Sequence, residues 1–171
     1  MTSESQRIKL RTLCPEDKKV LAQLANNKKI FDNVRDFFPF PYTEKNAIEF
    51  IEMCSKEDPA YTFAIEYQKE LAGVIGLVPQ SDVYRKSAEI GYWLGEPFWN
   101  KGIATEAVKL MTDYAFNTLK MVRVYTGVYD FNKASQRVLE KCGYKLECIF
   151  EKSIIKNNRI CNEYRYARVI D

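Results

Sequence analysis

The segment "AEIGYWLGEPFWNKGIATEAVKLMTDYA", residues 88–115, constrains the fold most, because it joins a strand pattern to a helix pattern through a short turn with glycine. The run "AEIGYWL" is typical of a strand. From about Ile103, apolar residues recur at three- and four-residue steps, as Ala107 and Met111 illustrate, which predicts an amphipathic helix. A further strand pattern, "MVRVYTGVY", follows. The segment thus predicts a strand, a helix and a strand in succession.

The remaining patterns complete a mixed sheet. "QRIKLRTL" alternates as a strand does, Pro15 opens one helix, and Thr43 is a suitable cap for a second. "YTFAIEY" and "LAGVIGLVP" form a hairpin around "QKE", and residues 144–170 are typical of two strands joined at "KNNR". "NKASQRVLEKCG" is a short helix with Asn132 as its N-cap and Gly143 at its end. We expect a single α/β (α+β) domain over residues 1–171.

Charge and length exclude several classes of protein. The 171 residues carry a net charge of +3, and basic residues alternate with acidic ones, as in "EKNAIEFIEMCSKED". A nucleic-acid-binding surface gathers its basic residues on one face, so no nucleic-acid partner is expected. The N-terminal segment lacks the apolar stretch of a secretion signal, and no run approaches the ~20 apolar residues of a membrane span. We therefore expect a cytoplasmic protein without a membrane partner.

The side chains present limit the possible chemistry. The chain has no histidine, which excludes Ser-His-Asp and Cys-His catalysis and removes the commonest transition-metal ligand. The five cysteines are odd in number and show no CxxC spacing, which indicates reduced thiols and no metal site. Carboxylates, tyrosines, lysines, hydroxyls or water must perform any acid–base step.

The turn before the helix at residue 103 is a candidate anion site. The first N–H groups of a helix lack intrahelical partners, and the helix dipole makes that end partly positive. Gly102 allows close approach of a phosphate to the backbone, Lys101 adds a charge, and Ala104 keeps the approach unobstructed. The Thr105 hydroxyl is a further donor. An ordinary strand–helix connection is the alternative interpretation. Neither a P-loop nor a Rossmann fingerprint occurs.

Two blocks resemble the GNAT N-acetyltransferase superfamily. "EIGYWLGEPFWNKGIATEA" looks like motif A, whose R/Q-x-x-G-x-G/A loop binds the pyrophosphate of acetyl-coenzyme A through backbone amides. Gly102 and Ala104 match that loop, but Trp99 stands where the family has Arg or Gln. "NKASQRVLEKCGY" resembles a second block of the family, and the closing "NEYRYA" is similar to the RimJ/RimL-like branch, which includes acetyltransferases of ribosomal-protein N-termini.

The resemblance implies a fold and a cofactor site. The fold would be a central mixed, mostly antiparallel seven-stranded sheet with about four flanking helices, splayed between strands four and five. Acetyl-CoA would be the co-substrate, with its pantetheine arm in that gap beside the backbone of Trp93 and Leu94. Its pyrophosphate would lie on Asn100, Lys101, Gly102, Ile103, Ala104 and Thr105.

The resemblance also implies catalytic roles. Glu89 occupies the position of the strand-four glutamate that acts as base in some members, although it could instead pair with a cation on a neighbouring strand. The tyrosine that many members use as general acid is replaced by Leu139, so Ser135 is the expected substitute; its alternative role is to assist the helix cap. Asn132 can cap its helix and also contact the pantetheine amide. Glu163 is interpreted as structural.

The sequence is compatible with three functions, which differ in the acceptor of the acetyl group. A protein N-terminal α-amine is the leading hypothesis, since it is partly neutral at pH 7. A small amine such as a polyamine, amino sugar or antibiotic is the main alternative, and a non-catalytic acyl-CoA-binding domain is a third. A polyamine enzyme should line its pocket with carboxylates. In the loop "FFPFPY", Phe37, Phe38, Phe40 and Tyr42 either pack over the sheet edge or wall the acceptor pocket. A homodimer is possible by resemblance.

Overall fold

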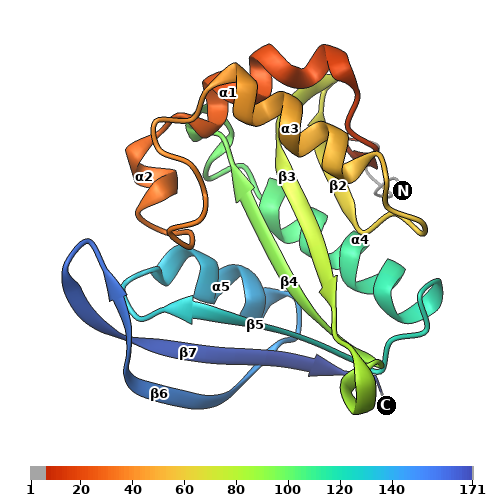
Figure 1. Cartoon of the computed structure of the whole chain (residues 1–171). Helices are drawn as coiled ribbons and strands as arrows, with labels where there is room; N and C mark the ends of the chain where they lie inside the picture. The colour runs from red at the N-terminus through yellow and green to blue at the C-terminus, as the bar shows by residue number, and fades with distance from the viewer. Residues whose placement is uncertain (1–6, 171) are drawn as a thin grey trace. The chain divides into compact units, whose positions relative to one another are not determined.

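The computed structural model describes residues 7–170 and contains a seven-stranded sheet in the order β1-β2-β3-β4-β5-β7-β6 (Figure 1). The strands are β1 (Ile8–Arg11), β2 (Thr62–Tyr67), β3 (Glu70–Pro79), β4 (Ser87–Leu94), β5 (Arg123–Tyr129), β6 (Lys145–Lys156) and β7 (Arg159–Val169). The pairs β1–β2, β2–β3, β5–β7 and β6–β7 are antiparallel, and β4–β5 is parallel. The predicted mixed, mostly antiparallel sheet is confirmed.

Five α-helices accompany the strands in the described part of the chain. They are α1 (Lys18–Ala25), α2 (Lys28–Phe31), α3 (Glu44–Cys54), α4 (Ile103–Asn117) and α5 (Lys133–Lys141). Short 3-10 turns occur at η1 (Pro15–Asp17), η2 (Asp82–Tyr84) and η3 (Glu96–Phe98). Helix α2 was not among the four helices expected from the sequence. Asn27 begins it, because its side chain accepts a 2.8 Å hydrogen bond from the N–H of Lys29.

The chain divides into two compact units. One contains the described residues up to Gly76 together with Tyr92–Leu110, and the other contains Leu77–Gly91 together with the described residues from Met111 onward. The core of the first unit gathers apolar side chains from α1, α3, β2 and β3 and from the segments that precede η1 and α3. Its buried members are Leu13, Leu21, Ala22, Ala25, Tyr42, Ala47, Ile51, Ala64, Leu71 and Val74. Helix α3 begins at the predicted cap, Thr43, which forms a capping box with Asn46.

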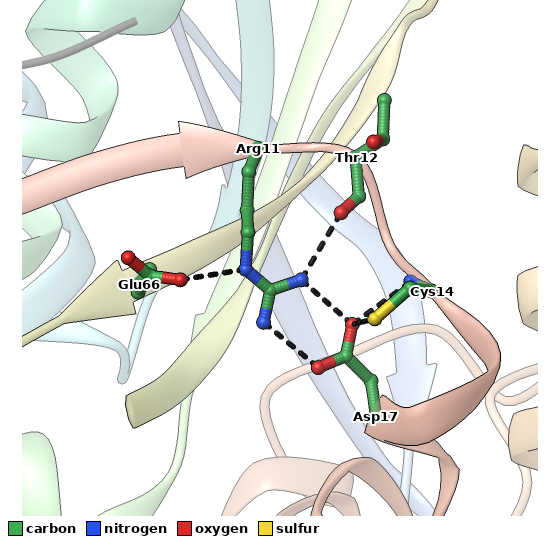
Figure 2. A network of polar contacts seen from close by, with 5 residues as sticks. All are labelled: Arg11, Thr12, Cys14, Asp17 and Glu66. Atoms are coloured by element: carbon green, nitrogen blue, oxygen red, sulfur yellow. Dashed lines mark hydrogen bonds and ion pairs between the residues drawn. The ribbon is translucent and has the colours of Figure 1, made fainter. Parts of the chain in front are cut away.

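Arg11 ties three segments of the first unit together (Figure 2). Its guanidinium donates from Nη1 and Nη2 to the two carboxylate oxygens of Asp17, at 2.7 and 2.8 Å, and from Nε to Glu66 at 2.7 Å. The Asp17 carboxylate also accepts from the backbone N–H of Cys14 at 2.9 Å. This network fastens η1, at the start of α1, to the paired strands β1 and β2.

The second unit has one buried and one open sheet face. On β5, Val124, Thr126 and Val128 are buried, and the residues between them are half-buried. Helix α5 packs on the buried side, where Glu140 accepts a 3.0 Å hydrogen bond from the hydroxyl of Tyr166 on β7. Residues that alternate with the buried ones, Tyr125 among them, belong to the opposite face.

The parallel pairing of β4 with β5 is short. It joins Ser87 to Arg123, Ala88 to Val124 and Glu89 to Tyr125. Strand β4 continues to Leu94 and β5 to Tyr129, so the ladder covers only the first part of each strand. This agrees with the predicted separation of strands four and five.

Candidate active site

The glycine turn before α4 has the geometry of an anion site. Asn100 and Gly102 both have positive φ, +60° and +78°, and Gly102 accepts the first helical hydrogen bond, 3.2 Å from the N–H of Glu106. The amides of residues 103–105 therefore stand at the helix N-terminus, ahead of that first bond. A Cβ added to Gly102 would meet no atom within 4 Å. Glycine is required here by its backbone conformation, and the space beside it is open.

The side chains of the turn divide between core and solvent. Ile103 is buried and anchors the helix start, whereas Asn100, Lys101 and Gly102 are exposed. The ammonium of Lys101 lies 5.7 Å from the centre of the Phe98 ring, a cation–π contact that holds the charge beside the turn. An exposed backbone nest, a helix N-terminus and a lysine together suit a pyrophosphate.

Trp99 fastens this turn to the end of β4. Its indole Nε1 donates a 2.8 Å hydrogen bond to the carbonyl oxygen of Leu94. Sequence reasoning registered Trp99 only as a departure from the family pattern and missed this role. Because the Leu94 carbonyl accepts this bond, one of the backbone acceptors predicted for the pantetheine arm already has a partner.

Strand β3 approaches β4 closely at a glycine. A Cβ at Gly73 would clash with the carbonyl oxygen of Trp93, so only glycine fits this position. The backbone N–H of Gly95 donates to the carbonyl of Ala72 at 2.8 Å, which continues the contact past the end of β4. These contacts direct the Trp93 carbonyl toward β3. Sequence reasoning did not identify Gly73.

In the second unit, Asn132 and Ser135 lie together at the start of α5. The side-chain oxygen of Asn132 accepts a 3.1 Å hydrogen bond from the N–H of Ser135, which confirms Asn132 as the N-cap. Gln136 is buried and donates to the carbonyls of Tyr129 and Asp130, at 3.3 and 3.2 Å. Sequence reasoning missed Gln136, which fixes the helix start to the end of β5. Leu139, in the position of the family's tyrosine, is fully buried.

Glu89 lies on the open face of the second unit. It is partly buried and stands opposite Tyr125 in the last pair of the β4–β5 ladder. Farther along β5, a Cβ at Gly127 would fall 2.5 Å from the carboxyl carbon of Glu163. The missing side chain lets the Glu163 carboxylate lie directly over β5, where Arg165 donates to it from Nε at 2.9 Å. This agrees with the structural role expected for Glu163.

A hollow of about 400 Å³ opens in the second unit. Its lining comes from β5, β7, the start of β4 and the segment between β3 and β4, and consists of Gln80, Tyr84, Ser87, Arg123, Tyr125 and Arg165. Two of these side chains are cations and none is a carboxylate. Sequence reasoning did not find this hollow.

The aromatic loop is divided between core and solvent. Phe38 packs against the core of the first unit, with ring centres 5.1 Å from Tyr42 and 6.0 Å from Trp93. Phe40 stacks on Phe31 of α2 at 5.1 Å. Phe37 is 81% exposed. Packing thus accounts for three of the four aromatic residues named from the sequence, and Phe37 is the exception.

Three of the cysteines have raised pKa values. Burial raises the pKa of Cys54 to about 11, and burial also raises the pKa values of Cys14 and Cys161. Thiols with raised pKa values are protonated at neutral pH and are poor nucleophiles. Within residues 7–170, no group of three or more Cys, Asp or Glu side chains is arranged to hold a metal ion. None of the helices described is both long and apolar enough to cross a membrane.

Comparison with known proteins agrees with this geometry. A family model described as "Acetyltransferase (GNAT) domain" matches residues 7–145. The probable N-acetyltransferase YjcK of Bacillus subtilis (strain 168) is 34% identical over 139 residues, which cover 80% of this chain and 75% of that protein. The spermidine N(1)-acetyltransferase of Escherichia coli (strain K12) is 31% identical over 143 residues, which cover 82% and 74%.

Solved structures show the same fold. RimL, a ribosomal alpha-N-protein acetyltransferase crystallised with coenzyme A, matches with a TM-score of 0.85 and 25% identity. The match covers 100% of this chain and 97% of RimL. The family match over most of the sequence, the relatives above 30% identity and the shared fold together show that this chain belongs to the GNAT N-acetyltransferase family.

Proposed function

We propose that this chain transfers an acetyl group from acetyl-CoA directly to the α-amine at the N-terminus of a polypeptide. One observation carries the choice of acceptor: the hollow on the second unit is lined by Arg123 and Arg165 and by no carboxylate. Glu147 and Glu163 pair with these two arginines, so the hollow lacks the excess of carboxylates that would attract a polycation. RimL, similar over the whole chain, is an alpha-N-protein acetyltransferase.

The turn before α4 would hold the co-substrate. The amides of residues 103–105, the exposed Gly102 and Lys101 would bind its pyrophosphate, and Asn100 would line the same turn. The backbone of residues 93 and 94 would lie beside the pantetheine arm, with Asn132 contacting one of its amides. The residues present fit a diphosphate, because the turn offers backbone donors, open space and a positive charge.

Three proton and charge requirements define the catalytic roles. As the N–C bond forms and the C–S bond breaks, the amine loses a proton, the carbonyl oxygen gains charge, and the departing thiolate takes a proton. Glu89, alone or through water, would accept the amine proton, and Ser135 would pass its proton to sulfur and take one back from water. An α-amine, with a pKa of about 7.7–8.0, needs only a weak base. No acyl-enzyme is involved.

A small amine is the second candidate acceptor. It rests on the spermidine N(1)-acetyltransferase of Escherichia coli, which is 31% identical to this chain. We further propose a cytoplasmic location, in keeping with five cysteines that form no disulfide, and one catalytic domain over the whole chain. The long, exposed strand β6, at the end of the strand order, would suit a homodimer.

Thermal unfolding with acetyl-CoA tests the co-substrate first. At about a hundred times its dissociation constant, a ligand adds roughly 2.7 kcal/mol, which raises the melting temperature by about 5–10 °C for a chain of this size. ATP and NAD at the same concentration are the controls. No rise with acetyl-CoA would contradict the proposal.

Turnover with three acceptors then tests the amine. A short peptide with a free N-terminus, the same peptide with a blocked N-terminus, and spermidine are compared by thiol release. Acetylation of the free peptide alone is expected. Turnover of spermidine alone would assign the chain to the small amines, and binding of acetyl-CoA without any turnover would indicate a non-catalytic domain.

A further inference from the structure

The hollow in the second unit is an open depression with the volume of a ligand site. Its volume of about 400 Å³ lies within the usual range of small-molecule pockets, roughly 300–1,000 Å³. Arg123 and Tyr125 reach it from β5, and Arg165 reaches it from β7. The two arginines form the cationic part of its wall, and Tyr125 forms an aromatic part.

Tyr125 organises the two arginines. The guanidinium carbon of Arg123 lies 5.6 Å from the centre of the Tyr125 ring, and that of Arg165 lies 5.2 Å from it. Arg165 also lies 5.1 Å from the ring centre of Phe150. Contacts with aromatic rings limit the rotamers of a guanidinium without occupying its N–H donors. The two cations are therefore held in place with donors to spare.

Each arginine has one carboxylate partner and retains an unused nitrogen. Arg123 donates hydrogen bonds from Nη1 and Nη2 to the carboxylate of Glu147. Arg165 donates from Nε and Nη2 to the carboxylate of Glu163. Among the described residues, no hydrogen bond uses Nε of Arg123 or Nη1 of Arg165. Both carboxylates lie outside the lining of the hollow, so they orient the guanidinium groups without filling it. A guanidinium with a spare donor suits a carboxylate ligand.

The distance between Glu89 and the hollow determines which residue of a bound peptide can contact the arginines. Glu89 pairs with Tyr125, and Ser87, two residues earlier on β4, lines the hollow. Two strand residues span about 7 Å. Two extended residues of a peptide span about the same distance. An amine beside Glu89 would thus place the second or third residue of its peptide near the arginines.

We infer that this hollow binds a carboxylate carried by the acceptor, and that in a polypeptide acceptor it is an acidic side chain at the second or third residue. This inference rests on the proposed function, because it specifies the acceptor of the same reaction. Arg165 is the specificity-determining residue, and Arg123 assists it. A free amino acid offers the same chemistry through its α-carboxylate.

Steady-state acetylation of matched peptides tests the inference. The peptides Ala-Glu-Ala-Ala-amide and Ala-Gln-Ala-Ala-amide differ only in one charge, and a second pair carries Glu or Gln at the third position. We expect KM to be about tenfold lower for a Glu peptide than for its Gln partner. Arg165→Gln should abolish that difference. Arg159→Gln, an exposed arginine at the start of β7 outside the hollow, should preserve it.

Several outcomes would overturn the inference. Equal KM values within both peptide pairs would do so and would leave the proposed function intact, since both peptides would still be acetylated. Persistence of the difference in Arg165→Gln would also contradict it. Preference for free alanine over alaninamide, without any Glu preference among the peptides, would overturn the acidic peptide side chain as the source of the carboxylate and assign it to a small acceptor. Melting temperatures with acetyl-CoA confirm that each variant is folded.

Discussion

The indole N–H of Trp99 lies 2.8 Å from the carbonyl oxygen of Leu94 and joins the turn before α4 to the end of β4. Trp99, which departs from the family pattern, thus has a structural role, because its hydrogen bond holds the turn in place. The arrangement couples the proposed cofactor loop to the strand that would lie along the pantetheine arm.

Trp99→Phe should loosen the cofactor loop. The variant keeps an aromatic ring but loses the hydrogen bond to Leu94, which costs about 0.5–1.5 kcal/mol of stability. We expect acetyl-CoA affinity to fall several-fold, measured by isothermal titration calorimetry. Tyr144→Phe is the control, because it removes the 2.7 Å hydrogen bond between an aromatic side chain and Thr112, outside the turn. An unchanged affinity in Trp99→Phe would show that the hydrogen bond does not order the loop.

Gly102→Val should weaken acetyl-CoA binding about tenfold or more. Valine is strained at a φ of +78°, and its methyl groups would occupy the open space beside the helix N-terminus. Gly143→Val is the control, because Gly143 has a φ of +80° and lies at the end of α5. Both variants should lose about 1–3 kcal/mol of stability in urea unfolding. Equal affinity losses would attribute the effect to strain rather than to the site.

Ser135→Ala should lower kcat by at least about tenfold while leaving acetyl-CoA affinity nearly unchanged, since a general acid acts on the transition state. The cap of α5 uses the side chain of Asn132 and the backbone N–H of residue 135, so the helix start should survive the substitution. Ser153→Ala on β6 is the control. Unchanged kcat in Ser135→Ala would leave the hydroxyl without a catalytic role.

The sheet and the helix ends followed from local signals in the sequence. Thr43 and Asn132 were predicted as N-caps, and both accept hydrogen bonds from the first turns of their helices. The turn at "KNNR" has positive φ at Asn157 and Asn158, as a tight hairpin requires. Helix α2 escaped prediction because four residues are too few to show a helical period.

The hollow and its lining could not be predicted, because they depend on strand register. Arg165 reaches Tyr125 only because β7 pairs antiparallel with β5, with Gly127 opposite Arg165. A one-residue shift would turn Arg165 to the other face. The role of Trp99 was hidden for a related reason: its indole meets the carbonyl of Leu94 only after η3 folds the chain back.

Gly127→Ala should destabilise the protein through Glu163. The new methyl group would fall 2.5 Å from the carboxyl carbon of Glu163, so this side chain must move away from Arg165. We expect a loss of about 1–3 kcal/mol in urea unfolding. In the background of Glu163→Ala, the same substitution should cost markedly less. Additive losses in this double-mutant cycle would show that the two residues are not coupled.

Acid should remove the stability that Asp17 contributes. Burial raises the pKa of its carboxyl, but hydrogen bonds from Arg11 and from the N–H of Cys14 outweigh burial and hold the pKa below its ordinary value of 3.8. A carboxyl with a lowered pKa in the folded state stabilises that state fully above the ordinary value and loses this contribution as the pH falls through the folded value. The stability of the wild type should therefore decline below about pH 4 through this group.

Asp17→Asn tests this dependence. At pH 7 we expect a loss of about 1.5–3 kcal/mol in the free energy of unfolding, because the substitution removes charge-assisted hydrogen bonds from Arg11, which keeps Glu66 as a carboxylate partner. The difference from the wild type should stay constant down to about pH 5 and shrink toward pH 2, since acid neutralises the carboxylate in the wild type alone. Glu49→Gln, an exposed carboxylate on α3, should change stability little at any pH. A difference independent of pH would assign the loss to packing and not to the charge of Asp17.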